Sequence, residues 1–408
     1  MLAYIIGVVL FALGIGISVA LHEAGHMFTA KWFGMKVRRY FIGFGPKLWS
    51  TRRGETEYGL KALPLGGFCD IAGMTALDEV TPDEAPRAMW KFATWKRLIV
   101  MAAGSITHFI VGFIVLYLMA ITLGLPNLTD KPVVGEVSQC AQSQDPKSLN
   151  LTACKPGDPA PAKTGGLAVG DQVESVDGTP TSTWTDVVSK VQAKKSGTVA
   201  LVVRRGDSDV RLTLQVATVG RVTDPAAQPG KDNKLTQVGA IGAGEQQYFP
   251  YNGLTAFGGT GAFTGQMFAN VWEGLKQFPQ RIPALVKSIG GGKRDPNTPI
   301  SVVGASRLGG QAVQDGLWSF FWLLLATLNF FIGVFNLLPL LPMDGGHIAV
   351  LLYEKVRDWV RGLRGRAAGG PVDYTKLTAV TMVVVVLGGA LVLLTVTADI
   401  VNPIRIGQ

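Results

Sequence analysis

Length, composition and charge together indicate a membrane protein with a sizeable soluble part. The chain has 408 residues, of which 48% are hydrophobic and 16% are charged, with a mean hydropathy of +0.28 and a formal net charge of +9. A basic chain often binds nucleic acid. The positions of its basic residues argue against that class here, because many of them flank long apolar segments.

Four segments lack charged residues over the roughly 20 residues that a membrane-spanning helix requires. The first is not read as a signal peptide, because no basic region precedes it and because cleavage would remove a candidate metal motif. All four are therefore predicted to be transmembrane helices, at Leu2–Leu21, Leu98–Leu125, Leu317–Met343 and Leu377–Ala398.

The first predicted helix leads into the motif His22-Glu23-Ala24-Gly25-His26. A charge near the middle of a membrane helix costs about 2.5–3.5 kcal/mol, so polar residues there indicate function. On a helix the two histidines share one face and can bind a single zinc ion, while Glu23 can accept a proton from a zinc-bound water. The alternative is an accidental, hydrogen-bonded pair, although these are two of only four histidines in the chain.

The distribution of basic residues predicts the topology. Residues 31–97 hold 12 Lys and Arg and residues 346–376 hold six, whereas residues 126–316 hold 19 together with 16 acidic residues. By the positive-inside rule the two short basic segments are cytoplasmic and the long segment is outside. Both termini are then outside, and the histidine motif lies at the cytoplasmic end of the first helix.

The first cytoplasmic segment is predicted to contain a β-hairpin. Residues 39–50 and 55–63 show short apolar alternation and flank a turn-rich break at residues 51–54, which is the pattern of two paired strands. The alternative is a solvated basic loop. Large apolar side chains make that alternative less favourable, namely Phe41, Phe44, Leu48 and Trp49.

The outside segment begins with a β-rich region at residues 126–220, in which Gly165–Gly178 resembles the core of a bacterial PDZ domain. PDZ domains bind peptide ends by strand addition. An insertion at residues 138–163 contains Cys140 and Cys154, which are either disulfide-bonded, as the outside location permits, or two free thiols. Because the insertion falls near the expected carboxylate-binding loop, the region either binds peptide C-termini or excludes bulky ectodomains.

The third zinc ligand is predicted to be Asp344. It belongs to the sequence Asn-Leu-Leu-Pro-Leu-Leu-Pro-Met-Asp-Gly-Gly at residues 336–346, and it is the only acidic residue between Asp315 and Glu354. A catalytic zinc requires three protein ligands and one open position. The prolines interrupt the helix at the depth of the two histidines, where irregular backbone is tolerated if it lines a cavity. The alternative is an ordinary turn in which Asp344 caps the next helix.

These features together resemble the site-2 protease family of intramembrane zinc metalloproteases, and most of all the bacterial branch that cleaves anti-sigma factors. The histidine motif, the Pro-x-x-Pro-Met-Asp-Gly-Gly sequence and the PDZ-like segment occur in the family's order over nearly the whole chain. The resemblance implies that His22, His26 and Asp344 bind Zn²⁺ and that Glu23 is the general base. It also implies a set of substrate-binding residues, which are Asn329, Asn336, Pro339 and Pro342.

Two positions depart from the family pattern. The residue before Asp344 is Met343 where leucine is usual, and residues 103–108 read Ala-Gly-Ser-Ile-Thr-His in place of Ala-Gly-Pro-x-x-Asn. The role of His108 is therefore open between an auxiliary residue of the site and a hydrogen-bonded packing residue. The resemblance further implies that the hairpin dips into the membrane near the zinc, where its edge can pair with an extended substrate.

The sequence thus predicts a polytopic α-helical membrane protein with four transmembrane helices, a membrane-associated β-hairpin and an α+β PDZ-like extracytoplasmic domain. Four regions are expected. Residues 1–125 contain the first two helices and the hairpin, and residues 126–220 contain the PDZ-like domain. Residues 221–315 form an extracytoplasmic linker and membrane-surface segment, and residues 316–408 contain the last two helices.

The expected function is hydrolysis of peptide bonds in the transmembrane segments of single-pass membrane proteins, such as anti-sigma factors, after a first extracytoplasmic cut. Zn²⁺ is the expected cofactor, the lipid bilayer and these substrates are the expected partners, and no nucleic acid is involved. The protein is expected in the cell membrane, with its active site near the cytoplasmic side. One alternative is a catalytically silent receptor that binds partners through the PDZ-like domain, against which the intact Glu23 argues. A zinc carrier is a further alternative, but polar groups occur at only one depth of the helices.

Overall fold

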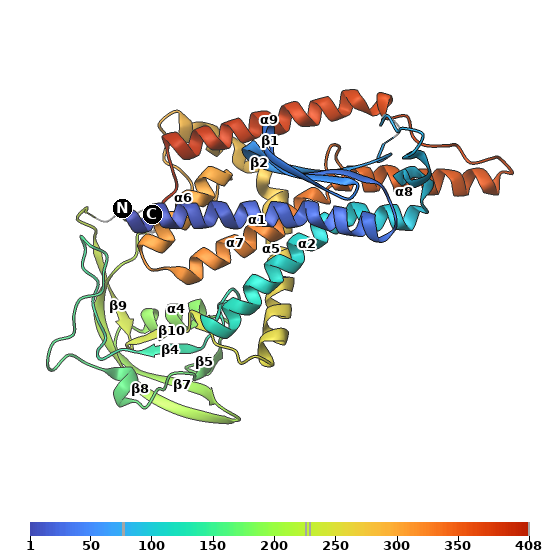
Figure 1. Ribbon diagram of the computed structural model, residues 1–408. Coiled ribbons are helices and arrows are strands. Elements are labelled where there is room, and N and C mark those ends of the chain that lie inside the picture. Colours follow the sequence, from blue (N-terminus) through green and yellow to red (C-terminus); the bar gives the residue numbers. More distant parts are fainter. Residues whose placement is uncertain (76–77, 225–226, 228–229, 407–408) are drawn as a thin grey trace. The chain divides into compact units, whose positions relative to one another are not determined.

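The computed structural model shows two compact units (Figure 1). It describes residues 1–75, 78–224, 227 and 230–406. The helical unit, as it is called below, comprises Met1–Thr122 and Asn252–Gln408, and the inserted unit comprises Leu123–Tyr251. The chain therefore leaves the helical unit after its first two long helices and returns to it for the remainder.

The described part of the helical unit contains seven α-helices. They are α1 (Leu2–Trp32), α2 (Thr94–Thr122), α5 (Thr255–Ile289), α6 (Val302–Gln314), α7 (Trp318–Asn336), α8 (Asp344–Leu363) and α9 (Thr378–Val401). Short 3₁₀ turns occur at Ala85–Arg87, Met89–Lys91 and Tyr374–Leu377. Among the described residues, α1, α2, α7 and the segment Tyr374–Val401 are long and apolar enough to cross a membrane. The expectation of four transmembrane helices is confirmed in length and composition.

The third of these helices is shorter than predicted. The apolar run continues to Met343, but α7 ends at Asn336, because Pro339 and Pro342 lack the N–H group that a helix requires. The backbone instead closes in short turns, with Leu338 N–H donating to Phe335 and Met343 N–H donating to Leu340. This interruption frees the chain to change direction before α8 begins.

A long amphipathic helix, α5, occupies much of the segment that was expected only to lie on the membrane surface. It has 35 residues and packs against α2, α7 and α9. The Phe268 ring lies 5.0 Å from the Phe109 ring of α2 and 5.2 Å from the Phe330 ring of α7. Aromatic contacts of this kind add to the apolar area that is buried. Helix α5 therefore stabilises the packing of α2 and α7.

The predicted hairpin is present and is longer than expected. Strand β1 (Val37–Arg53) pairs antiparallel with β2 (Thr56–Ile71) around the turn at Gly54, whose φ of +60° suits glycine. Its base packs against the end of α1 and the start of α2 in a buried apolar cluster that includes Met27, Val37 and Val100. The hairpin is therefore attached to the part of α1 that carries the histidine motif.

The inserted unit is rich in short strands. They are β3 (Leu125–Pro126), β4 (Val134–Val137), β5 (Gln172–Val176), β6 (Thr179–Pro180), β7 (Gly197–Arg205), β8 (Ser208–Val222), β9 (Leu235–Ala240), β10 (Ala243–Glu245) and β11 (Tyr248–Phe249), with helices α3 (Pro161–Thr164) and α4 (Trp184–Lys194). The main sheet has the order β6-β5-β7-β8-β9, and β10-β4 and β11-β3 form separate pairs. Alternating side chains of β5, β7 and β8 and one face of α4 form its core.

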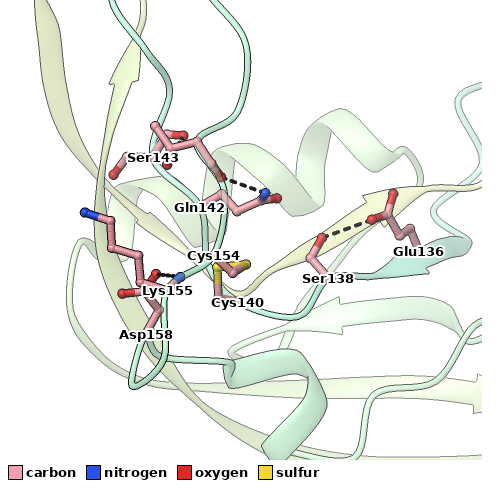
Figure 2. Close-up of a disulfide and its surroundings, with 9 residues drawn as sticks. Glu136, Ser138, Cys140, Gln142, Ser143, Cys154, Lys155 and Asp158 are labelled. Carbon is pink, nitrogen blue, oxygen red and sulfur yellow. Dashed lines mark hydrogen bonds between the residues drawn. A yellow bond between two sulfur atoms is a disulfide. The ribbon is translucent and has the colours of Figure 1, made fainter.

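Two features of this unit were left open or placed differently by the sequence, namely where the unit ends and whether Cys140 and Cys154 are bonded. The unit continues past residue 220 to Tyr251, because β9, β10 and β11 pair with β8, β4 and β3. Cys140 and Cys154 are joined by a disulfide (Figure 2), so the first of the two alternatives for these cysteines holds. The bond closes the insertion at its base.

Candidate metal centre

The three predicted metal ligands come together at the end of α1. His22 and His26 lie on adjacent turns of this helix, and Asp344 is the first residue of α8. The Nε2 atoms of the two histidines are 3.2 Å apart, and Asp344 Oδ2 lies 3.4 Å from His22 Nε2 and 3.3 Å from His26 Nε2. All three ligand atoms fall within 4.8 Å of one another. Residues that are more than 300 positions apart in the sequence thus form one group.

These separations fit a tetrahedral zinc ion. Ligand atoms placed about 2.0–2.1 Å from zinc in tetrahedral geometry are about 3.3–3.4 Å from one another, which is close to the measured values. Asp344 Oδ2 is buried and forms no hydrogen bond with a described residue, and an unsatisfied buried acceptor is costly. A cation between the three atoms would remove that cost. Two imidazoles and one carboxylate also leave the fourth position free for water.

The backbone of α2 orients His26. Its Nδ1–H donates to the Val100 carbonyl oxygen at 2.7 Å, which leaves Nε2 free as a ligand atom. A hydrogen bond of this kind fixes the ring orientation and raises the basicity of a metal-binding histidine. Both histidines are buried, with exposed fractions of 8% for His22 and 7% for His26.

Gly104 of α2 provides the space for the ligand atoms. A Cβ at this position would overlap His26 Nε2 and would lie 2.5 Å from His22 Cε1 and 2.7 Å from His22 Nδ1. Any larger residue would therefore occupy the volume between the two imidazoles. The close approach of α1 and α2 at the centre thus depends on the absence of a side chain at Gly104.

The turn before α8 delivers Asp344. Gly345 and Gly346 are buried, and a Cβ on Gly346 would lie 2.5 Å from Leu341 N, so the chain can fold back closely on itself only with glycine at these positions. The alternative in which Asp344 caps the helix does not hold, because Met343 occupies the cap position and Asp344 Oδ2 lies between the two histidines. A carboxylate in the first turn also interacts favourably with the helix dipole.

Glu23 lies beneath strand β2. A Cβ on Gly67 would be 3.0 Å from Glu23 Cγ, and the Cys69 N–H faces the Glu23 carboxylate. The side chain interacts electrostatically with His26 and Asp344, so it lies beside the three candidate ligands without being one of them. A carboxylate in this position is suited to act as a general base that accepts a proton from a water molecule at the centre.

The predicted substrate-binding residues lie in different environments. Asn329 is buried within α7, where its Nδ2 donates to the Leu325 carbonyl at 2.9 Å and its Oδ1 accepts from His108 Nδ1–H at 3.0 Å. Asn336 is half-buried at the end of α7, and Pro339 and Pro342 are exposed in the following turn. Their roles in substrate binding stay predictions.

His108 has both of the features that the sequence left open. Its ring lies 5.0 Å from the His22 ring, so it lines the centre, and its hydrogen bond to Asn329 holds it in place. Sequence reasoning did not identify Gly104 or the Val100 carbonyl. A backbone carbonyl has no sequence signal, whereas a glycine one turn before a histidine in an apolar segment is a signal that could have been used.

Comparisons with known proteins agree with the chemistry of this site. A family model described as peptidase family M50 matches residues 10–380. The chain is 49% identical over 409 residues to a protein named zinc metalloprotease Rip1 from Mycobacterium tuberculosis, which covers 99% of this chain and 100% of that protein. It is 46% identical to the Rip1 of Mycolicibacterium smegmatis, with 99% of each chain covered. A membrane metalloprotease named ARASP from Arabidopsis thaliana is 28% identical, over 91% of this chain and 74% of its own length.

Proposed function

The chain belongs to peptidase family M50 and is a zinc metalloprotease of the site-2 protease type, and from that premise we propose that it cuts within the transmembrane segments of single-pass membrane proteins. Anti-sigma factors are the proposed substrate class, and a first extracytoplasmic cut is proposed to precede the reaction. The observation that supports this best is the meeting of His22, His26 and Asp344 at the end of an apolar helix long enough to span a membrane.

The proposed chemistry uses three ligands and one base. Zn²⁺ held by His22, His26 and Asp344 would act as a Lewis acid and lower the pKa of its bound water. Glu23 would accept a proton from a water molecule as the oxygen of that water attacks the scissile carbonyl carbon. The same carboxyl group then donates the proton to the amine nitrogen as the peptide bond breaks. A catalytically silent receptor would not need a carboxylate beside the ligands, so Glu23 favours the enzyme.

The hairpin is proposed to present the substrate in an extended form. A peptide bond inside a helix is enclosed by its own hydrogen bonds and side chains, so a transmembrane substrate must unwind before water can attack it. Strand addition supplies main-chain hydrogen bonds that replace those of the helix. The passage of β2 over Glu23 at Gly67 supports this role, because a strand paired there would lie next to the base.

The inserted unit is proposed to lie outside and the metal centre near the cytoplasmic side. The support is the charge distribution, with many Lys and Arg in residues 31–97 and 346–376 and a nearly balanced long segment between the second and third spans. The inserted unit is further proposed to withhold the centre from substrates that still carry a bulky ectodomain.

The central proposal is tested by reconstitution. Wild-type protein and Glu23→Gln are placed in liposomes with a single-pass substrate that lacks its ectodomain, and the products are mapped by mass spectrometry. The expected result is one cut inside the apolar segment by the wild type and none by Glu23→Gln. Cuts only in residues outside the apolar segment would show an ordinary membrane-anchored protease instead.

The exclusion proposal needs two substrates and two enzymes. Full-length and trimmed substrate are offered to the wild type and to a variant in which a flexible linker replaces Leu123–Tyr251. Exclusion predicts that the variant, but not the wild type, cuts the full-length form. If the variant binds zinc, refuses the full-length form and cuts the trimmed form as the wild type does, exclusion is wrong.

A further inference from the structure

The two histidines of the metal centre are held in different ways. The outer nitrogen of His26, Nδ1, donates its proton to the Val100 carbonyl at 2.7 Å. The outer nitrogen of His22, also Nδ1, is buried and forms no hydrogen bond with a described residue, although Gly104 lies beside it. A metal-binding histidine usually has its ring fixed through this nitrogen. The orientation of the His22 ring must therefore come from another contact.

The ring of His108 makes that contact. The centroids of the His22 and His108 rings are 5.0 Å apart and their planes are inclined at 43°, which is within the 4.5–7 Å range of paired aromatic rings. His108 is on α2, one turn after Gly104, and its side chain is 1% exposed. Helical side chains lean towards the N-terminus of their helix, so this ring leans towards the space that Gly104 leaves open.

His108 is itself fixed from the other side by Asn329 of α7. The Nδ2 of Asn329 donates to the Leu325 carbonyl at 2.9 Å, and a carbonyl can only accept, so the amide oxygen is the end that faces His108. This oxygen accepts from His108 Nδ1–H at 3.0 Å. The proton of His108 is thereby assigned to Nδ1, and a ring with one fixed hydrogen bond cannot turn freely. One series of contacts thus runs from α7 through α2 to the ligand on α1.

These contacts also bear on the role that the family resemblance implies for Asn329. Its side chain is 1% exposed, and both ends of its amide are already hydrogen-bonded within the helical unit. A substrate could reach it only if those buried bonds were broken, which is costly. Position 108 is also one of the two at which the chain departs from the family pattern, with histidine in place of asparagine.

We propose that His108 is a positioning residue of the metal centre and that Asn329 acts through it. Held by Asn329, the His108 ring keeps His22 Nε2 directed at the other two ligand atoms, which lie 3.2 Å away on His26 and 3.4 Å away on Asp344. The proposal rests on the assignment of His22 as a ligand in the proposed function. It does not depend on which substrate is cut or on where the cut falls.

The test is zinc affinity of the full chain in detergent, measured by competition with a chelator. Asn329→Leu removes the hydrogen bond to His108 without changing a residue that touches the metal, and zinc affinity should fall by about 10–100-fold, the usual effect of losing a supporting group. His108→Phe keeps a ring but not the hydrogen bond and should show a similar fall. The matched control is Thr327→Val, which removes a half-buried hydrogen bond to Leu323 on the same helix and should leave zinc affinity unchanged.

A double variant and a spectrum sharpen the test. Because both substitutions remove the same support, Asn329→Leu combined with His108→Phe should bind zinc no more weakly than either single variant. With Co²⁺ in place of zinc, the visible absorption spectrum reports the arrangement of the ligands. It should change in both single variants and should match the wild type in Thr327→Val.

The two roles for Asn329 give opposite results. If Asn329 binds substrate, Asn329→Leu raises KM and leaves zinc affinity and the Co²⁺ spectrum as in the wild type, and that result would overturn the proposal. Unchanged zinc affinity in His108→Phe would overturn it as well, so the outcome does not depend on how one variant folds. Failure of the proposed function looks different, because zinc affinity then falls as expected in the variants while the wild type cuts no transmembrane substrate.

Discussion

The metal centre and the charged network at the turn of the hairpin, in which Glu55 pairs with Arg87, are both built from separate chain segments, but they differ in how much freedom those segments have. At the centre, the buried rings of His22 and His26 lie against Gly104, and even one methyl group on Gly104 would overlap His26 Nε2. The network is open to solvent, with the side chain of Arg87 42% exposed and that of Glu55 34% exposed. The comparison indicates that small changes should abolish chemistry at the centre and should only adjust stability at the network.

The largest effect is expected from loss of a ligand. Asp344→Ala removes one of three donor atoms and leaves the two buried histidines without their carboxylate partner, so both zinc binding and cleavage should be lost. His22→Ala and His26→Ala should behave alike. Zinc content by mass spectrometry and cleavage of a single-pass substrate are the measurements. Full zinc retention in Asp344→Ala would mean that the third ligand lies elsewhere.

Glu23→Gln separates metal binding from chemistry. The amide cannot accept the proton of water, so cleavage should fall by about 10²–10⁴-fold, the usual contribution of a general base. Zinc content should match the wild type, because Glu23 is not among the ligands. The two measurements are made on the same preparation. Cleavage within about tenfold of the wild type would remove Glu23 from the proposed mechanism.

The centre could be predicted from the sequence because its chemistry leaves few other interpretations. Two histidines and a glutamate at helical spacing in an apolar segment are costly unless they act, and Asp344 is the only acidic residue in its region. The four long apolar segments were identified by the absence of charge over about 20 residues. The role proposed for His108 had no such signal, because its hydrogen-bond partner Asn329 lies 221 positions away and only the packing of α2 against α7 brings the two together.

Element boundaries were the other limit of sequence reasoning. The apolar run up to Met343 suggested a longer helix, whereas the prolines end α7 at Asn336. The PDZ-like domain was expected to end at residue 220, but the chain returns to pair β9 with β8. In both cases the deciding interaction is a backbone hydrogen bond, either lost at proline or made across a sheet, and hydropathy does not report it.

Substitution of Gly104 tests whether the metal centre is tightly packed. Gly104→Ala places a methyl group between the two imidazoles, so zinc affinity should fall by about 10–100-fold, the range seen when surrounding groups of a metal site are disturbed. The matched control is Gly16→Ala in α1, where an added Cβ meets nothing within 4 Å. That variant should bind zinc as the wild type does. Equal zinc affinity in both variants would show that the metal centre tolerates an added side chain and is not tightly packed.

The smallest expected effect comes from the charged network at the turn of the hairpin, between the end of β1 and the start of β2. Glu55 accepts from Arg87 at 2.6 and 2.7 Å and pairs with Lys36 at 3.2 Å, and the hydrogen bonds from Arg87 lower the pKa of Glu55 to about 2. A carboxyl group with a lowered folded-state pKa stabilises the fold above its ordinary value of about 4.5, and this contribution is lost as the pH falls towards 2.

Glu55→Gln should therefore destabilise the protein at pH 6 and have almost no effect near pH 2. The difference at pH 6 is expected to be no more than about 1 kcal/mol, because the pair is partly exposed to solvent. Thermal unfolding of the wild type and the variant in the same detergent measures it, and the use of a difference cancels groups that titrate alike in both proteins. A gap between the two that persists unchanged at pH 2 would show that Glu55 acts through packing. A difference in stability that disappears at pH 2 would show that ionic interactions stabilise this part of the helical unit. The metal centre, in contrast, depends on close packing.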